Sequence, residues 1–188
     1  ASERPINKNI TEILPAIRMM LSQDDLKVLK IRNNSLIESY LENEQQFKKI
    51  ARPFTPDIIV FCKSNYLYIN EENDPEKILE TFEKKLKAFR EEHDQLPKII
   101  LIRHLGIIAV EDQAKSAETV LDIYEDLIKI SCYAETFGGP NFMNDREIAF
   151  IENWEAEKYR HALAKKNQKS FSVKHQTAIV TGGSQGFG

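Results

Sequence analysis

KIILIRHLGIIAV, residues 98–110, is the stretch that decides the class of fold. It holds two apolar runs, which Arg103, His104 and Gly106 separate. Short runs of aliphatic and β-branched residues that are bounded by a glycine are typical of buried strands. We therefore predict two strands here, or a single strand that bends at the glycine.

The residues after this stretch predict a long helix with one apolar face of small residues. Asp112 is the expected N-cap, and Gly138-Gly139-Pro140 should end the helix. The alternative for Phe137 to Pro140 is a flexible loop that holds a ligand. The apolar face repeats at intervals of three and four and contains Ala114, Ala117, Leu121, Tyr124, Ile128 and Ser131.

The residues before the 98–110 stretch also predict a helix. Asp74-Pro75-Glu76 combines an N-cap, a proline at the first helical position and an early acid. An apolar stripe follows at Ile78, Phe82, Leu86 and Phe89. Further upstream, DIIVFC (57–62) and YLYI (66–69) predict two strands of a hairpin, joined by Lys63-Ser64-Asn65.

The rest of the chain alternates in the same way. We predict a helix that opens at Pro15, a strand over 28–33 and a helix over 35–47 that Ser35 caps. A last helix should start at Asn144 with Glu147 and run to about residue 164. In it, Trp154 either covers the core with one side or belongs to an interaction patch. This order predicts an α/β domain: a mixed sheet with flanking helices in two or three layers.

Composition excludes several classes of function. The chain has 188 residues and a formal net charge of −3, which does not favour a nucleic-acid partner. No apolar run reaches the ~20 residues that a membrane span needs. The start has no signal-peptide pattern, so we predict a cytoplasmic protein. Cys62 and Cys132 each lie in an apolar run and are predicted to be buried free thiols.

The last residues, TAIVTGGSQGFG (177–188), resemble the cofactor-binding opening of the short-chain dehydrogenase/reductase family. An apolar strand leads into a glycine-rich turn that lets the backbone approach a pyrophosphate. The resemblance implies that Thr181, Gly182, Gly186 and Gly188 bind NAD or NADP in an intact protein. A dinucleotide site cannot close on a strand and a turn, so we expect this chain alone to bind no nicotinamide cofactor.

The block ILIRHLGIIAVEDQAKSAETVLDIYEDLIKISCYAE (100–135) resembles the strand–strand–helix that closes class II aldolase/adducin domains. That family has His-Gly, with a zinc-binding histidine, where this chain has Leu105-Gly106. His104 stands one place upstream, and a slip of one residue turns a side chain to the other face of a strand. The other histidines are isolated, so we expect no metal site.

With both stretches in this order, the chain resembles the bifunctional rhamnulose-1-phosphate aldolase/alcohol dehydrogenase family. This resemblance implies an aldolase-like domain over 1–166, a polar linker over 167–176 and the truncated first strand and turn of a Rossmann domain over 177–188. The intact protein would be an oxidoreductase that acts on a sugar-derived alcohol or aldehyde, and this fragment would be non-catalytic. The alternative is a structural, oligomerisation or sugar-phosphate-binding module without enzymatic activity, and a homo-oligomer is compatible with either.

Two groups of polar residues remain as candidates. Arg103 and His104, beside Gly106 at a strand end, are the best candidates for a site that binds a small anionic ligand. Asp122, Glu125 and Asp126 follow helical spacing, and we interpret them as a solvated face.

Overall fold

A mixed four-stranded sheet forms the centre of the domain in the computed structural model, which describes residues 9–22, 25–71 and 74–154. The strand order is β1-β4-β3-β2; β3 and β2 are parallel, and the two other pairs are antiparallel. The strands predicted at 28–33 and 66–69, and the strand pair at 98–110, are confirmed. They are β1 (Val28–Arg32), β2 (Leu67–Ile69), β3 (Ile99–Ile102) and β4 (Gly106–Glu111).

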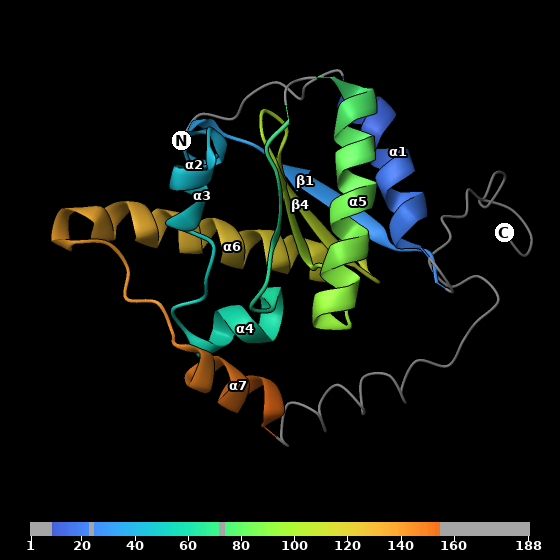
Figure 1. The fold of residues 1–188 in the computed structure, drawn as a ribbon. Helices are drawn as coiled ribbons and strands as arrows, with labels where there is room; N and C mark the ends of the chain where they lie inside the picture. The colour runs from blue at the N-terminus through green and yellow to red at the C-terminus, as the bar shows by residue number, and fades with distance from the viewer. Residues whose placement is uncertain (1–8, 23–24, 72–73, 155–188) are drawn as a thin grey trace, which may run out of the picture.

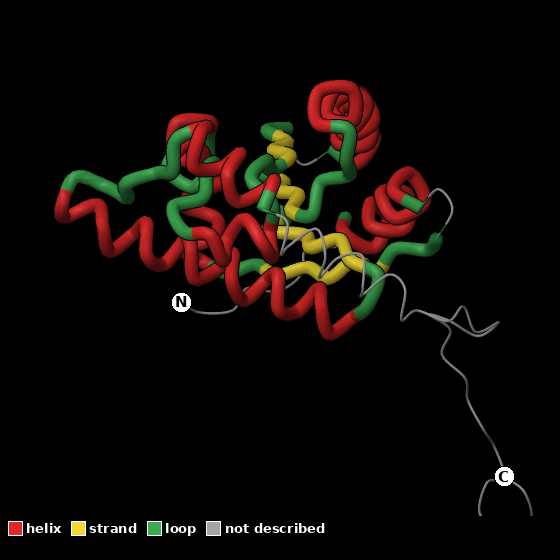
Figure 2. The backbone as a smooth tube through the Cα atoms, turned by 90° about the horizontal axis from the view of Figure 1, so that it is seen from below, coloured by secondary structure: helices red, strands yellow, loops and turns green. Residues whose placement is uncertain are grey.

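Helices cover both faces of this sheet, so the domain has three layers. In Figures 1 and 2, α1 and α5 lie side by side on one face, and α6 crosses the other. The predicted α/β class with flanking helices is confirmed. The helices are α1 (Ile10–Leu21), α2 (Ser35–Leu41), α3 (Glu44–Lys48), α4 (Pro56–Cys62), α5 (Pro75–His93), α6 (Ala114–Ala134), the 3-10 turn η1 (Glu135–Phe137) and α7 (Asp145–Asn153).

The apolar runs of β3 and β4 serve both faces because successive side chains of a strand point in opposite directions. Ile99 and Leu101 join the cluster under α2, α4 and α6, whereas Ile100 and Ile102 join the cluster under α1 and α5. All four are fully buried. Each buried isoleucine or leucine contributes about 1.5–3 kcal/mol of hydrophobic stabilisation. A strand without any polar alternation is therefore what a sheet covered on both faces requires.

The crossover from β2 through α5 to β3 places two strand ends at one edge of the sheet. The Asp74 side chain accepts hydrogen bonds from the backbone of Glu76 and Lys77, as predicted, and the four residues of the predicted α5 stripe are all buried. Because β2 and β3 are parallel, their carboxyl ends meet, and the Arg103 amide donates to the Ile69 carbonyl at 3.0 Å. This geometry positions the site described below.

The segment 57–62 is helical, so the predicted strand and hairpin there are wrong. Thr55 is extended and Pro56 takes the first helical position, where its fixed φ favours a helix. Ile58, Ile59 and Cys62 are buried on one side of α4. The apolar run had no period that could separate a buried helix from a strand.

Several helix starts also differ from the prediction. α1 begins at Ile10 and contains Pro15 in its interior, where a stripe of buried residues compensates for the missing hydrogen bond. Asn34, not Ser35, caps α2, and a second cap at Asn43 breaks the predicted 35–47 helix into α2 and α3. Asp112 does not cap α6; its carboxylate instead pairs with Lys27 at 2.6 Å.

In the last described residues, the helix boundaries agree with the prediction, but the exposure of Cys132 does not. Asn144 and Glu147 form the predicted capping box of α7, and α6 ends before Gly138 as expected. Cys132 is exposed, however, because the far end of α6 extends beyond the sheet. The predicted helix beyond Trp154, the linker and the TAIV strand lie outside the described residues.

Candidate functional site

The tight turn between β3 and β4 forms the centre of the candidate site. The Leu105 amide donates to the Ile102 carbonyl at 3.0 Å, and His104 adopts the left-handed conformation with φ 62°. Gly106 has φ +112°, and a Cβ there would lie 2.8 Å from the Asn33 Cβ and closer still to the Arg32 carbonyl oxygen. Only glycine fits this position, which fixes the turn against the end of β1.

Arg103 leaves this turn with a half-buried side chain that has no hydrogen-bond or ion-pair partner among the described residues. Its Nε is buried without a hydrogen-bond acceptor, and no carboxylate of the described residues forms an ion pair with the guanidinium. The terminal nitrogens are not among the buried unpartnered atoms, so they reach solvent. The Nε end of the guanidinium is thus enclosed by protein, and its two terminal nitrogens are accessible.

Tyr68 lies near enough to Arg103 to be influenced by its positive charge. The Tyr68 hydroxyl donates to the Leu41 carbonyl at 2.8 Å, and the Tyr68 ring stacks on Phe47 at 4.4 Å between centroids. Burial raises the pKa of Tyr68, while the positive charge of Arg103 lowers it and the negative charge of Glu44 raises it. Tyr68 is therefore neutral and held in place by its hydrogen bond and ring contact, and its hydroxyl is influenced by both Arg103 and Glu44.

His104 and the predicted cofactor residues have different outcomes. His104 is exposed at the tip of the turn, next to Arg103 in sequence, and its role as a ligand residue stays a prediction. Thr181, Gly182, Gly186 and Gly188 lie outside the described residues. Within the described part of the chain, no group of three or more His, Cys, Asp or Glu side chains is arranged to hold a metal ion.

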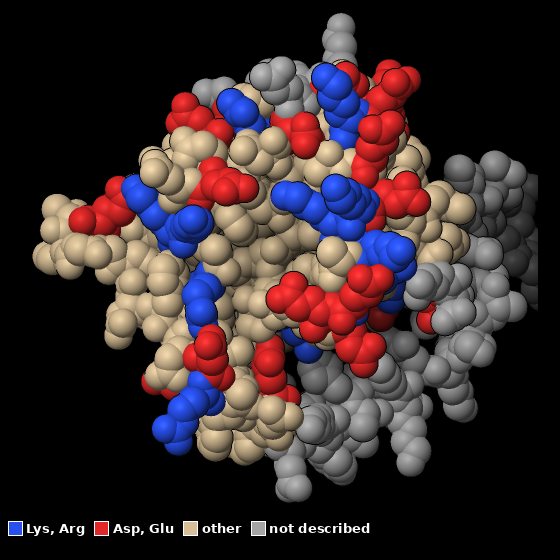
Figure 3. Space-filling model, viewed as in Figure 1, with Lys and Arg blue, Asp and Glu red and all other residues tan. Residues whose placement is uncertain are grey.

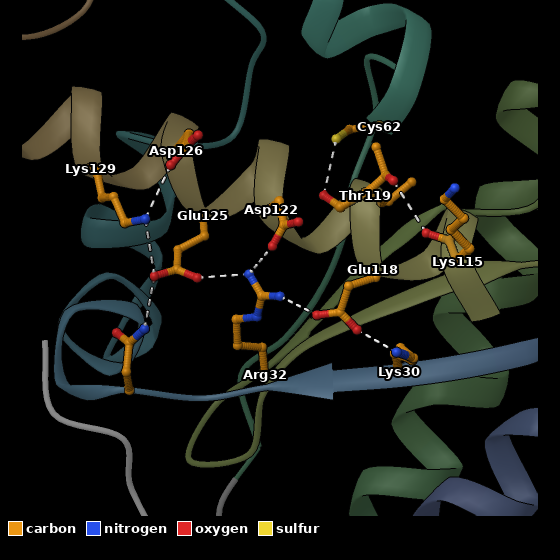
Figure 4. A network of polar contacts seen from close by, with 12 residues as sticks. Lys30, Arg32, Cys62, Lys115, Glu118, Thr119, Asp122, Glu125, Asp126 and Lys129 are labelled. Carbon is orange, nitrogen blue, oxygen red and sulfur yellow. Dashed lines mark hydrogen bonds and ion pairs between the residues drawn. The ribbon is translucent and has the colours of Figure 1, made fainter.

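A second arginine at the same end of the sheet is fully paired (Figure 4). Arg32 contacts Glu118 at 2.5 Å, Asp122 at 2.7 Å and Glu125 at 2.9 Å, and Lys30 also pairs with Glu118. Hydrogen bonds from Lys30 and then Arg32 lower the pKa of Glu118. This arginine–carboxylate network joins β1 to α6 and is a structural feature of the fold.

The network corrects part of the prediction for the α6 acids. Asp122 and Asp126 are exposed as expected, but the Glu125 side chain is only 15% exposed and receives both Arg32 and Lys129. Sequence reasoning also missed Lys30 and Arg32. Their alternation with Leu29 and Ile31 along β1 was the available signal, because alternate residues of a strand share a face.

The opposite end of the sheet has a hollow of about 1080 Å³ between α4, the start of α6 and the strand ends. Its cations have partners: Lys27 pairs with Asp112, and Lys98 pairs with Glu111. On the face of the molecule that Figure 3 shows, basic and acidic side chains are likewise interspersed. None of the helices in the described residues is long and apolar enough to cross a membrane.

No protein-family model matches the chain, and the similar proteins include a curated oxidoreductase and two solved structures. YuxG of Bacillus subtilis, an uncharacterised oxidoreductase, is 25% identical over 196 residues; the match covers 94% of this chain and 28% of YuxG. The solved L-fuculose 1-phosphate aldolase has a TM-score of 0.48 and 17% identity, over 74% of this chain and 58% of its own. YgbL of Escherichia coli, provisionally described as an aldolase/epimerase/decarboxylase, has a TM-score of 0.48 and 12% identity, over 65% and 56%.

Proposed function

We propose that this chain is part of a longer oxidoreductase, in which the described α/β domain accompanies a nicotinamide-dependent domain. The observation that carries this proposal is the similarity to an oxidoreductase along 94% of the chain, which spans only 28% of that relative. The glycine-rich segment with Thr181, Gly182, Gly186 and Gly188 would open the NAD or NADP site. The bifunctional arrangement of an aldolase-like domain and a short-chain dehydrogenase is the finer form of the same proposal.

The proposed division of labour follows the predicted boundaries at 166 and 177. When bound, the nicotinamide ring would supply hydride transfer to or from a sugar-derived alcohol or aldehyde. The described domain would not perform this step. Its contribution would be to bind an anionic part of a substrate, or to hold subunits together, in the cytoplasm.

The gene downstream of Gly188 provides the first test. We expect an open reading frame that continues into a Tyr-x-x-x-Lys motif, and a full-length protein that reduces NAD or NADP with a sugar-derived alcohol. A stop codon directly after Gly188, or a full-length protein without this activity on a broad panel of such alcohols, would contradict the proposal.

A glycine substitution tests the cofactor segment in the full-length protein. Gly186→Val should raise the KM for the cofactor at least about tenfold, because a side chain would block the approach of the backbone to the pyrophosphate. Gly183→Ala is the matched control, since Gly183 occupies a variable place in the motif. Equal effects of the two substitutions on KM would argue against a dinucleotide site here.

A second function, binding of an anionic compound without catalysis, is favoured by the unpartnered Arg103 guanidinium. It is compatible with the first, because a domain of this kind can present a substrate to a neighbouring site. Experiments can distinguish the two functions. The first predicts cofactor reduction, and the second predicts ligand binding whether or not any cofactor is reduced.

A further inference from the structure

Arg103 differs from the other half-buried arginines of the described chain in having no acceptor. Arg18 donates to the Lys27 carbonyl at 2.6 Å. Arg90 Nε is buried without an acceptor, as Arg103 Nε is, but Arg90 Nη2 donates to the Met20 carbonyl at 3.0 Å. Arg32 meets three carboxylates. A half-buried guanidinium without an acceptor for any of its nitrogens costs free energy, so a purely structural arginine is expected to have at least one. The missing acceptor at Arg103 therefore points to a group from outside the protein.

The place of Arg103 in the fold supports the same reading. It follows β3 directly, at the carboxyl edge that β3 shares with the parallel strand β2. In open α/β sheets, ligands commonly bind outside the carboxyl ends of parallel strands, and β2 and β3 are the parallel pair of this mixed sheet. Asn70, which follows β2, is exposed at this edge, and its Oδ1 lies 3.4 Å from the Tyr68 hydroxyl.

The turn also holds the arginine stem in a fixed position. The Arg103 amide is bound to the Ile69 carbonyl, and the Gly106 contact with the end of β1 allows the turn no larger residue. Its buried Nε limits the rotation of the guanidinium, while the terminal nitrogens remain accessible. A fixed, planar fork of donors matches the two oxygens of a phosphate or carboxylate.

We propose that Arg103 binds a small oxyanion, the phosphate or carboxylate group of a sugar-derived compound, at the carboxyl edge of β2 and β3. The oxyanion follows from the geometry, and the sugar-derived class rests on the proposed function. Glu44 is an acidic residue near Tyr68, so the bidentate contact with Arg103 has to outweigh any repulsion from it. His104, exposed at the tip of the same turn, is the candidate for a second donor.

Titration calorimetry on the full-length protein tests the proposal with three probes. Glucose 6-phosphate carries the phosphate, gluconate carries the carboxylate, and glucose carries neither. We expect one of the two anions to bind and glucose not to bind. The anion that binds identifies the source of the oxyanion.

Arg103→Met supplies the decisive variant because it keeps the length of the side chain and removes every donor. We expect the affinity for the anion to fall at least about tenfold, with Tm in the absence of ligand unchanged or higher. Arg146→Met, at an exposed position of α7, is the matched control and should retain full affinity. Binding of neither anion, or equal binding by Arg103→Met, would overturn the proposal.

The result is independent of the proposed oxidoreductase activity. If the full-length protein binds the anion through Arg103 but reduces no cofactor, the site stands and the proposed function fails. If it reduces a cofactor but Arg103→Met binds anions normally, the proposed function stands and the site fails.

Discussion

Arg32 and Arg103 lie at the same end of the sheet, yet their surroundings are opposite. Arg32 leaves β1 toward α6 and meets the carboxylates of Glu118, Asp122 and Glu125. Arg103 leaves the turn after β3 and meets no acceptor. The described residues thus supply three carboxylates to Arg32 and none to Arg103. This difference separates a residue that stabilises the domain from a residue that is available to a ligand.

The largest expected effect comes from breaking the turn that positions both arginines. Gly106→Ala would force a Cβ against the backbone of Arg32 and require an L-residue at φ +112°. We expect a loss of about 3–5 kcal/mol in the free energy of unfolding, measured by urea denaturation.

A matched substitution separates strain from collision. Gly138 has φ +95°, but a Cβ there would meet nothing within 4 Å. Gly138→Ala should therefore cost only about 1 kcal/mol. Similar losses at Gly106 and Gly138 would show that the contact with β1 does not hold the turn.

The next largest effect should come from Arg32, the paired member of the comparison. In Arg32→Met, Glu125 loses its main partner although its side chain is largely buried. We expect a destabilisation of about 2 kcal/mol by chemical denaturation. Lys30→Met removes a more exposed partner of Glu118 and should cost about 0.5 kcal/mol. An Arg32 variant as stable as the wild type would remove the contrast with Arg103.

The pH dependence of stability sharpens the same contrast. Lys30 and Arg32 hold the pKa of Glu118 below 4.5 in the folded state. The unfolded chain then binds more protons, so this part of the stability is present above pH 4.5 and is lost as pH falls through the folded pKa. Thermal unfolding between pH 6 and 3 should show a shallower decline for Glu118→Gln than for the wild type. A Glu118→Gln variant with an unchanged slope would exclude this carboxylate as a contributor.

The smallest effect on stability is expected at Arg103 itself. Arg103→Met removes a buried donor that has no acceptor and keeps the apolar contacts of the side chain. The free energy of unfolding should change by less than about 0.5 kcal/mol, or increase. A loss comparable with that of Arg32→Met would mean that Arg103 has a structural partner.

Sequence patterns predicted the framework of the sheet well, where local chemistry and burial agree. The Asp74-Pro75 start, the α5 stripe and the break between β3 and β4 at Arg103 to Gly106 are all observed. The strand predicted at 57–62 was wrong because an unbroken apolar run has no period that separates a strand from a helix. Thr55-Pro56 did indicate a helix start. The predicted burial of Cys132 was wrong because helix periodicity does not show where a helix extends past the sheet that it covers.

The sequence predicted the residues of the candidate site but not the ion pairs beside it. Arg103 and His104 beside Gly106 indicated a site for a ligand, and within the described ranges Arg103 has no hydrogen-bond acceptor there. The pairing of Arg32 with acids of α6 joins residues about ninety positions apart. No local rule predicts such a contact, because it depends on how β1 and α6 pack.

The attachment of α7 differs from that of the helices that cover the sheet. None of its side chains is buried, and its contacts with the body include Asp145 with Arg52 and Glu152 with the buried hydroxyl of Ser64. Elements with little apolar burial open locally at a lower free energy than the core. Amide hydrogens of α7 should therefore exchange with solvent earlier than those of α6.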